Sequence, residues 1–201
     1  MPSDNKPNVI FIGGPMGSGK TTFARQLADI YGYEFVEGDD FHSDEMKQKM
    51  ASGIPLTDED RRPWLLSLAA LWQNNKERKM IIACSALKKD ILLGSNDEAT
   101  QHKVKIILLK VSEDNLRSRL AKRLKEDPKH FAPPSLLQSQ LEAFEVFFYF
   151  LWDKLLGFIR SVNFKKSSKN SKLPVNEPNV YIMENNEDSY GPAMDLFNNL
   201  C

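Results

Sequence analysis

A glycine-rich stretch near the N-terminus constrains the fold more than any other feature of the sequence. Residues 14–21 read G-P-M-G-S-G-K-T, which matches the phosphate-binding pattern G-x-x-x-x-G-K-[ST] at every fixed position. An apolar, β-branched run at residues 9–12 precedes the stretch, and residues 21–31 have the pattern of a helix. A strand, a glycine loop and a helix in this order are the context that the motif requires. We therefore expect a phosphate to bind at the N-terminus of that helix.

The residue types of the loop explain how it would hold a nucleotide. Its glycines allow the backbone to turn its N–H groups inward, where side chains would obstruct a phosphate. Lys20 can reach the β- and γ-phosphates, and the Thr21 hydroxyl can coordinate Mg²⁺. A glycine-rich turn that binds nothing would not need all these positions in register. The expected nucleotide contacts are Gly14, Pro15, Met16, Gly17, Ser18, Gly19, Lys20, Thr21 and Thr22.

Composition argues against several classes of protein. The chain has 201 residues, 41% of them hydrophobic, which is enough for one α/β domain spanning residues 1–201. Its 27 basic and 27 acidic residues cancel, so we expect no general attraction to nucleic acid or to an acidic membrane. Only two cysteines are present, and residues 1–8 are polar. These features favour a reduced, soluble, cytoplasmic protein without a transmembrane segment.

Apolar runs alternate with helical patterns along the chain. The expected strands are residues 9–12, 33–36, 80–84, 104–110 and 180–183. The expected helices are residues 21–31, 44–51, 58–74 and 113–124. This alternation predicts a three-layer α/β fold with a central parallel five-stranded sheet and helices on both faces. Ligands of such sheets bind outside the carboxyl ends of the strands, so residues 13–20, 37–42 and 85–89 are the candidate site loops.

Residues 144–164 do not fit this alternation. Apolar side chains fall on one helical stripe there, and charged residues interrupt the run, so it is a poor membrane span. Residues 165–174 read as a flexible basic linker. The segment is either an amphipathic helix packed on the domain or on a partner, or a helix that lies on a membrane surface.

Two further groups of polar residues follow the loop. Residues 37–42 read E-G-D-D-F-H and follow the second expected strand, which we place next to the strand of the phosphate loop. A carboxylate there could accept a proton from an attacking hydroxyl or hold Mg²⁺ through water. A solvated acidic turn is the alternative. Thr57 can cap a helix whose first turn is acidic, and Arg61 and Arg62 oppose the dipole of that helix. Their guanidinium groups could grip an acidic substrate, or pair with the neighbouring acids.

In combination these motifs resemble the gluconokinases, a family of shikimate-kinase-like P-loop kinases. The matching stretches, between residues 9 and 142, are G-P-M-G-S-G-K-T-T, E-G-D-D-F-H, K-M-A-S-G-I-P-L-T-D-E-D-R-R-P-W-L, A-C-S-A-L-K-K, R-L-A-K-R followed by H-F, and L-L-Q-S-Q-L-E. The resemblance implies ATP-dependent, Mg²⁺-dependent phosphorylation of D-gluconate to 6-phosphogluconate. It also implies a P-loop kinase fold with a mobile lid, at about residues 119–140, and commonly a homodimer.

The resemblance further implies roles for single residues. The residues implied as catalytic are Lys20, Asp39, Arg119 and Arg123. Asp39 resembles the general base or the holder of the substrate hydroxyl. Arg119 and Arg123 resemble lid arginines that close on the ATP phosphates; they lie four residues apart, hence on one face of the expected helix, which could equally be a solvated basic face. The residues implied on the gluconate side are Asp39, His42, Lys49, Arg61, Ser85, Lys88, His130 and Gln140.

Three regions depart from the family pattern. Residues 90–94 are shorter than the corresponding stretch and lack a basic group, the spacing from Arg123 to His130 is longer, and residues 146–174 replace a short connection into the last strand. The last segment reads as an insertion. Two alternatives therefore stay open: a kinase of another sugar acid or polyol, and a nucleotide-binding protein that has lost catalysis.

Overall fold

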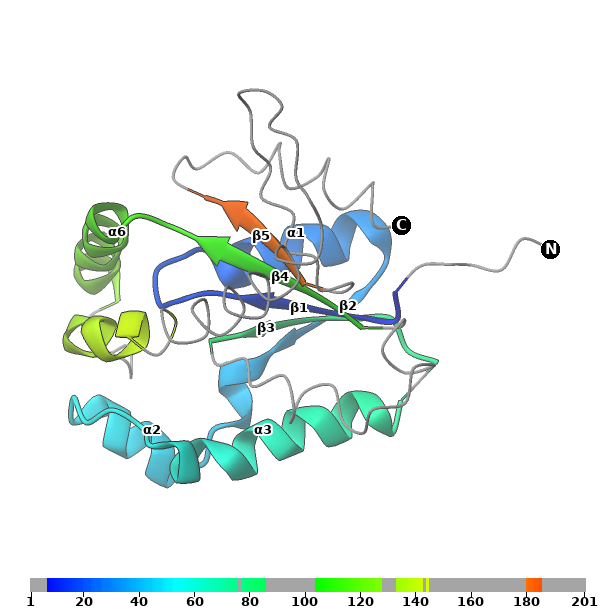
Figure 1. Cartoon of the computed structure of the whole chain (residues 1–201), viewed down its shortest axis with the longest axis horizontal. Helices are drawn as coiled ribbons and strands as arrows, with labels where there is room; N and C mark the ends of the chain where they lie inside the picture. The colour runs from blue at the N-terminus through cyan, green and yellow to red at the C-terminus, as the bar shows by residue number, and fades with distance from the viewer. Residues whose placement is uncertain are drawn as a thin grey trace, which may run out of the picture.

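Five parallel strands form one sheet in the order β2-β3-β1-β4-β5. The computed structural model describes residues 7–75, 77–85, 104–127, 133–142, 144 and 180–185. The strands are β1 Val9–Gly13, β2 Glu34–Glu37, β3 Met80–Cys84, β4 Val104–Lys110 and β5 Val180–Glu184. The predicted parallel five-stranded sheet is therefore confirmed, and its carboxyl ends share one edge (Figure 1).

The described helices follow the predicted pattern closely. They are α1 Lys20–Tyr31, α2 Asp44–Ala51, α3 Asp58–Gln73 and α6 Glu113–Glu126. The five predicted strands and the four corresponding predicted helices agree with the structure to within two residues at each end. The helix expected within residues 144–164 lies outside the described residues apart from Phe144. The sequence did not predict the 3₁₀ helices η1 Gly38–Phe41 and η2 Pro134–Leu136, nor the helical residues 137–142. Segments this short carry too few turns to show a helical period.

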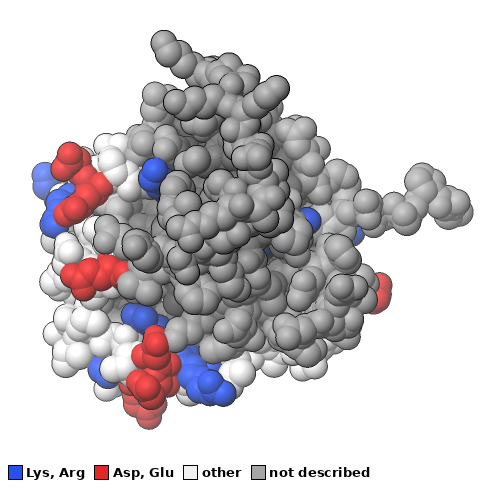
Figure 2. Space-filling view, in the orientation of Figure 1, with Lys and Arg blue, Asp and Glu red and all other residues white. Residues whose placement is uncertain are grey.

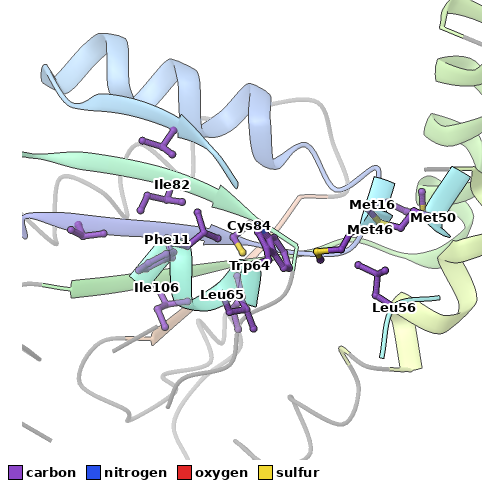
Figure 3. Close-up of a cluster of buried hydrophobic side chains, with 14 of the residues drawn as sticks. Phe11, Met16, Met46, Met50, Leu56, Trp64, Leu65, Ile82, Cys84 and Ile106 are labelled. Atoms are coloured by element: carbon purple, nitrogen blue, oxygen red, sulfur yellow. The ribbon is translucent and has the colours of Figure 1, made fainter. Parts of the chain in front are cut away.

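Alternate residues of the central strands build two cores, one on each face of the sheet. Phe11 of β1 pairs in register with Ile82 of β3 and Ile106 of β4, and all three enter one core (Figure 3). That core packs against α2, α3 and α6, whereas Ile10 and Ile12 pack against α1. Figure 1 shows α1 above the sheet and α3 below it. This confirms the predicted three layers.

The strand that leads to Asp39 does not lie where we expected it. We had placed it next to the strand of the phosphate loop, but β3 lies between β2 and β1. The chain crosses the end of β3 at Gly38, the first residue of η1, and this crossing directs Asp39 back towards the phosphate loop. A Cβ atom at Gly38 would lie 2.4 Å from the carbonyl oxygen of Ala83, so this close crossing requires glycine. The carbonyl of Gly38 accepts a hydrogen bond from Trp64 Nε1 at 2.7 Å, which fixes η1 to α3.

The start of α3 is capped as predicted. Asp60 N–H donates to Thr57 Oγ1 at 3.2 Å, and Thr57 N–H donates to Asp60 Oδ2 at 2.7 Å. This reciprocal pair is a capping box, which satisfies two backbone donors that the helix itself leaves free. The cap fixes the first turn of α3, and with it the place of Arg61.

Parts of three predictions lie outside the described residues. The insertion at residues 146–174 does so entirely, as does the shortened stretch at residues 90–94. The lid range is described at residues 119–127 and 133–140, and its mobility stays a prediction. None of the helices in the described part of the chain has the length and apolarity that a membrane crossing requires.

Candidate active site

The phosphate loop joins β1 to α1, as its motif predicts. Gly14, Gly17 and Gly19 have φ values of 153°, 78° and 89°, a region that L side chains rarely adopt. Gly17 also leaves room for α6, since a Cβ atom there would lie 3.2 Å from Leu120. Gly19 is the N-cap of α1 and supplies no side-chain hydrogen bond, so the first N–H groups of α1 stay available to an anion.

Lys20 lies at the centre of a group of charges. Its Nζ atom donates to the carbonyl oxygen of Pro15 at 3.0 Å. Burial lowers the pKa of Lys20, the negative charges of Asp39 and Glu37 oppose this shift, and Arg123 adds to it. The charges of Asp39, Glu37 and Arg123 therefore all act on the Lys20 ammonium. Three of them, Lys20, Asp39 and Arg123, are residues that we predicted as catalytic.

Glu37 is a functional candidate that the sequence reasoning missed. Its Oε2 atom accepts a hydrogen bond from Thr21 Oγ1 at 2.8 Å. Burial raises the pKa of Glu37, and the hydrogen bond from Thr21 works against this rise. The residue opens the E-G-D-D-F-H stretch, so its position was visible in the sequence, but its contact with the loop depends on how β2 and β1 are placed.

Thr21 and Glu37 fit a magnesium site that the nucleotide completes. The described residues contain no cluster of three or more His, Cys, Asp and Glu side chains that could hold a metal alone. Mg²⁺ is usually held by one or two protein oxygens together with substrate phosphates. The carboxylate of Glu37 fixes the orientation of the Thr21 hydroxyl, which is the ligand that we predicted.

A second group of side chains lies beside Asp39. The ring of His42 lies 4.0 Å from that of Trp64, at 31° between the ring planes. Its Nδ1 atom lies 3.1 Å from the Asp39 carbonyl oxygen and 3.8 Å from Asp39 Oδ1. Burial lowers the pKa of His42; Asp39 opposes this, and the charges of Lys47 and Arg61 reinforce it. The structure therefore brings Asp39, His42 and Trp64 together, and the charge of Arg61 acts on the His42 ring.

The two predicted cations of the acceptor side face acids of α3. Arg61 Nη1 lies 3.8 Å from Asp58 Oδ1, a separation too long for a hydrogen bond. Lys49 Nζ lies 2.5 Å from Asp60 Oδ2, in a groove of about 420 Å³ between α2 and α3. Lys49 therefore forms a hydrogen-bonded ion pair with Asp60, whereas Arg61 lies near Asp58 without a hydrogen bond to it. Figure 2 shows charges of both signs over this part of the surface and over α6.

Residues from the expected lid range and from the end of β5 are also linked to the phosphate loop by hydrogen bonds. Arg119 Nη2 donates to the Asn185 carbonyl oxygen at 3.0 Å, and Asn185 Nδ2 donates to the Ser18 carbonyl oxygen at 2.8 Å. Gln140 Oε1 accepts from the backbone N–H of Met16 at 2.8 Å. The contacts of Arg119 and Gln140 with phosphates and gluconate stay predictions.

The remaining predicted site residues lie at or beyond the edge of the described chain. Ser85 is half-buried and directly follows β3, at the carboxyl edge of the sheet. Lys88 and His130 lie outside the described residues. Asn185 could not have been found from the sequence, since it shares no pattern with the loop that it contacts.

Comparisons with known proteins identify the family of the chain. A family model described as an AAA domain matches residues 9–147. A probable gluconokinase of Mus musculus is 39% identical over 156 residues, which cover 69% of this chain and 83% of that protein. The chain belongs to the gluconokinase family. The predicted resemblance is thereby confirmed.

Solved structures extend the comparison to the fold of the gluconokinase family. A sugar kinase from Janibacter sp. HTCC2649 has a TM-score of 0.65 at 31% identity, covering 96% of this chain and 91% of its own. A gluconokinase from Sinorhizobium meliloti 1021 has a TM-score of 0.60 at 28% identity, covering 90% of this chain and 84% of its own. Both likenesses span most of the chain.

Proposed function

We propose that the protein transfers the γ-phosphoryl group of ATP to D-gluconate, giving 6-phospho-D-gluconate and ADP. Besides membership of the family, the surroundings of Asp39 support this proposal. The charge of Asp39 acts on Lys20 and on Arg123, while its main chain and carboxylate face His42. A candidate base therefore interacts with Lys20 of the phosphate loop and Arg123 of α6 on one side and with His42 on the other.

The chemistry follows from this placement. The Asp39 carboxylate would accept the proton of the attacking hydroxyl while that oxygen forms its bond to the γ-phosphorus. The bond from the γ-phosphorus to the bridging oxygen breaks, and ADP leaves with the electron pair. Charge spreads over the γ-oxygens during this exchange, and Lys20 and Arg123 would stabilise it. Arg119 would add to this on closure of the lid.

The acceptor would bind against η1 and α3. The Arg61 guanidinium can hold the gluconate carboxylate with two hydrogen bonds, because its contact with Asp58 is loose. A neutral His42 ring can exchange a hydrogen bond with a sugar hydroxyl. We keep Lys49, Ser85, Lys88 and His130 as further gluconate-side candidates, as the family resemblance implies.

Mg²⁺ would be held by Thr21, with Glu37 orienting the hydroxyl, and the nucleotide phosphates would complete the site. Once bound, the ion neutralises charge on the phosphate oxygens. The loop residues 14–22 would surround the nucleotide phosphates, and the backbone N–H groups at the start of α1 would donate to them. We also propose a homodimer, which gel filtration would test, and a cytoplasmic location, which follows the composition.

The test is ADP release from Mg-ATP with gluconate, other sugar acids, shikimate or water as the acceptor. We expect release that depends on gluconate, with 6-phosphogluconate identified by mass spectrometry. Release that requires a different sugar acid or polyol would replace gluconate as the substrate. Binding of ATP without acceptor-dependent release would contradict kinase activity and favour a nucleotide-binding protein.

A further inference from the structure

Gln140 contacts the phosphate loop from a distant part of the chain. Its Oε1 atom accepts a hydrogen bond from Met16 N–H at 2.8 Å, across a separation of 124 residues. A backbone N–H can only donate, so the amide oxygen must face it and Nε2 must point away. The contact therefore fixes the place and the orientation of the Gln140 amide group.

Apolar neighbours hold Gln140 in this position. Leu136 and Leu137 are buried, and Leu141 packs against the same core. Met16 belongs to that core as well, together with the methionines of α2 (Figure 3). A polar side chain among apolar ones needs a hydrogen-bond partner, and the phosphate loop supplies it.

The N–H of Met16 and the carbonyl of Pro15 belong to one peptide unit. This unit is planar, so its N–H and C=O groups point in opposite directions and turn together. Lys20 Nζ donates to the Pro15 oxygen at 3.0 Å, and Ser18 N–H donates to it at 3.2 Å. Gln140 thus holds one end of the peptide unit whose other end holds Lys20.

The partner of Lys20 decides how much of its charge a phosphate can use. Glu37 and Asp39 are close enough to act on the Lys20 ammonium, and either carboxylate would attract it if the Pro15 carbonyl turned away. The Pro15 oxygen is uncharged and takes one of the three ammonium donors. Two donors then stay available for the β- and γ-phosphates.

We propose that Gln140 is a positioning residue for Lys20 and acts through the Pro15–Met16 peptide unit. It keeps Lys20 directed into the phosphate loop, and away from Glu37 and Asp39, before the nucleotide arrives. The inference rests on the proposed kinase function. It gives Gln140 a role on the phosphate side, in place of the gluconate contact that the sequence predicts.

The first test uses the variant Gln140→Met, which removes the acceptor but keeps the length of the side chain. We expect kcat for gluconate-dependent ADP release to fall about tenfold, with KM for gluconate within about twofold of the wild type. Gln140→Glu keeps an oxygen opposite Met16 and should retain more of kcat. The control is Gln138→Met, because the exposed Gln138 donates to Glu142 at 3.2 Å on the same helical segment, and it should match the wild type.

A double-mutant cycle with Lys20→Ala tests whether Gln140 acts through Lys20. Calorimetric affinity for Mg-ATP is the readout, because it needs no acceptor. Gln140→Met should weaken that affinity about threefold in the wild type and leave it unchanged when Lys20 is alanine. Equal losses in both backgrounds, or a higher KM for gluconate at unchanged kcat, would overturn the proposal. ATP binding without gluconate-dependent release would contradict only the kinase function, since the binding cycle would still decide the role of Gln140.

Discussion

Consecutive residues, at positions 14–21, form the phosphate side of the candidate site. The acceptor side instead takes Asp39 from η1, His42 from the residue that follows η1, and Arg61 and Trp64 from α3. The partners of the cations differ as well. Lys20 donates a hydrogen bond to the uncharged carbonyl of Pro15, while Arg61 and Lys49 face carboxylates of α3. The phosphate side is therefore ready for an anion, and the acceptor side has to exchange internal charge contacts for substrate contacts.

This difference has kinetic consequences. A group that is already in place for the transition state contributes mainly to kcat. A group that gives up an internal partner to bind the ground-state substrate contributes mainly to KM. Changes on the phosphate side should thus lower turnover, and changes at Arg61 should weaken gluconate binding.

Lys20→Ala should have the largest effect. We expect kcat to fall about a thousandfold, because the γ-phosphoryl group loses its main cation in the loop. The melting temperature should not drop, since burial disfavours the charged Lys20. Turnover equal to that of the wild type would refute the role of Lys20 and remove the contrast between the two sides.

Asp39→Asn should lower kcat about a hundredfold and leave the affinity for ATP nearly unchanged, because the variant cannot accept the proton of the hydroxyl. The matched control is Asp40→Asn, since Asp40 is the next residue and is exposed. A large loss of ATP affinity at unchanged turnover would assign Asp39 to the phosphate side instead.

The sequence predicts the phosphate side better because its information is local. The spacing of glycines, Lys20 and Thr21 specifies the loop without reference to other parts of the chain. The periodic spacing of apolar residues likewise predicts the long helices and the strands from local sequence. The order of the strands was not visible, since the interposition of β3 between β2 and β1 depends on how the crossovers pack.

Contacts between distant residues account for most of what the sequence missed. Glu37 reaches Thr21 across 16 residues, Gln140 reaches Met16 across 124, and Asn185 Nδ2 reaches Ser18 across 167. Glu37 and Gln140 each carried a signal: Glu37 opens the E-G-D-D-F-H stretch, and Gln140 is a polar residue among the apolar positions 136, 137, 141 and 144. Such a position predicts a partner but does not say which residue it is.

Glu37→Gln tests whether the phosphate side extends to β2. We expect the Mg²⁺ concentration for half-maximal activity to rise about thirtyfold, because the Thr21 hydroxyl loses its charged acceptor. Glu34→Gln is the control on the same strand, where the exposed Glu34 pairs with Arg78. An unchanged Mg²⁺ requirement would confine the phosphate side to the loop itself.

The variant Arg61→Ala tests whether Arg61 binds the gluconate carboxylate on the acceptor side. We expect KM for gluconate to rise about tenfold and KM for ATP to stay nearly constant, because a charge-assisted pair with the carboxylate is lost. Arg62→Ala is the matched control, since Arg62 is the exposed neighbour on the same helix. An effect confined to ATP would place Arg61 on the donor side.

His42 should make the acceptor side sensitive to acid, with the smallest effect of the series. Burial lowers the pKa of His42 in the folded chain, below an unfolded value of about 6.5. The unfolded chain therefore takes up the proton first as the pH falls. The stability that the neutral ring contributes is present above that unfolded value and is lost through the lowered folded pKa.

The measurement is the melting temperature of the wild type and of His42→Gln at pH 7.5 and at pH 5.5. Asp39, Lys47 and Arg61, whose charges act on the ring, are present in both proteins, so the comparison isolates the contribution of the His42 side chain. We expect the wild type to lose a few degrees more than the variant over this interval. Parallel losses would show that the His42 ring does not resist protonation, and that the Trp64 side of the site is open to water.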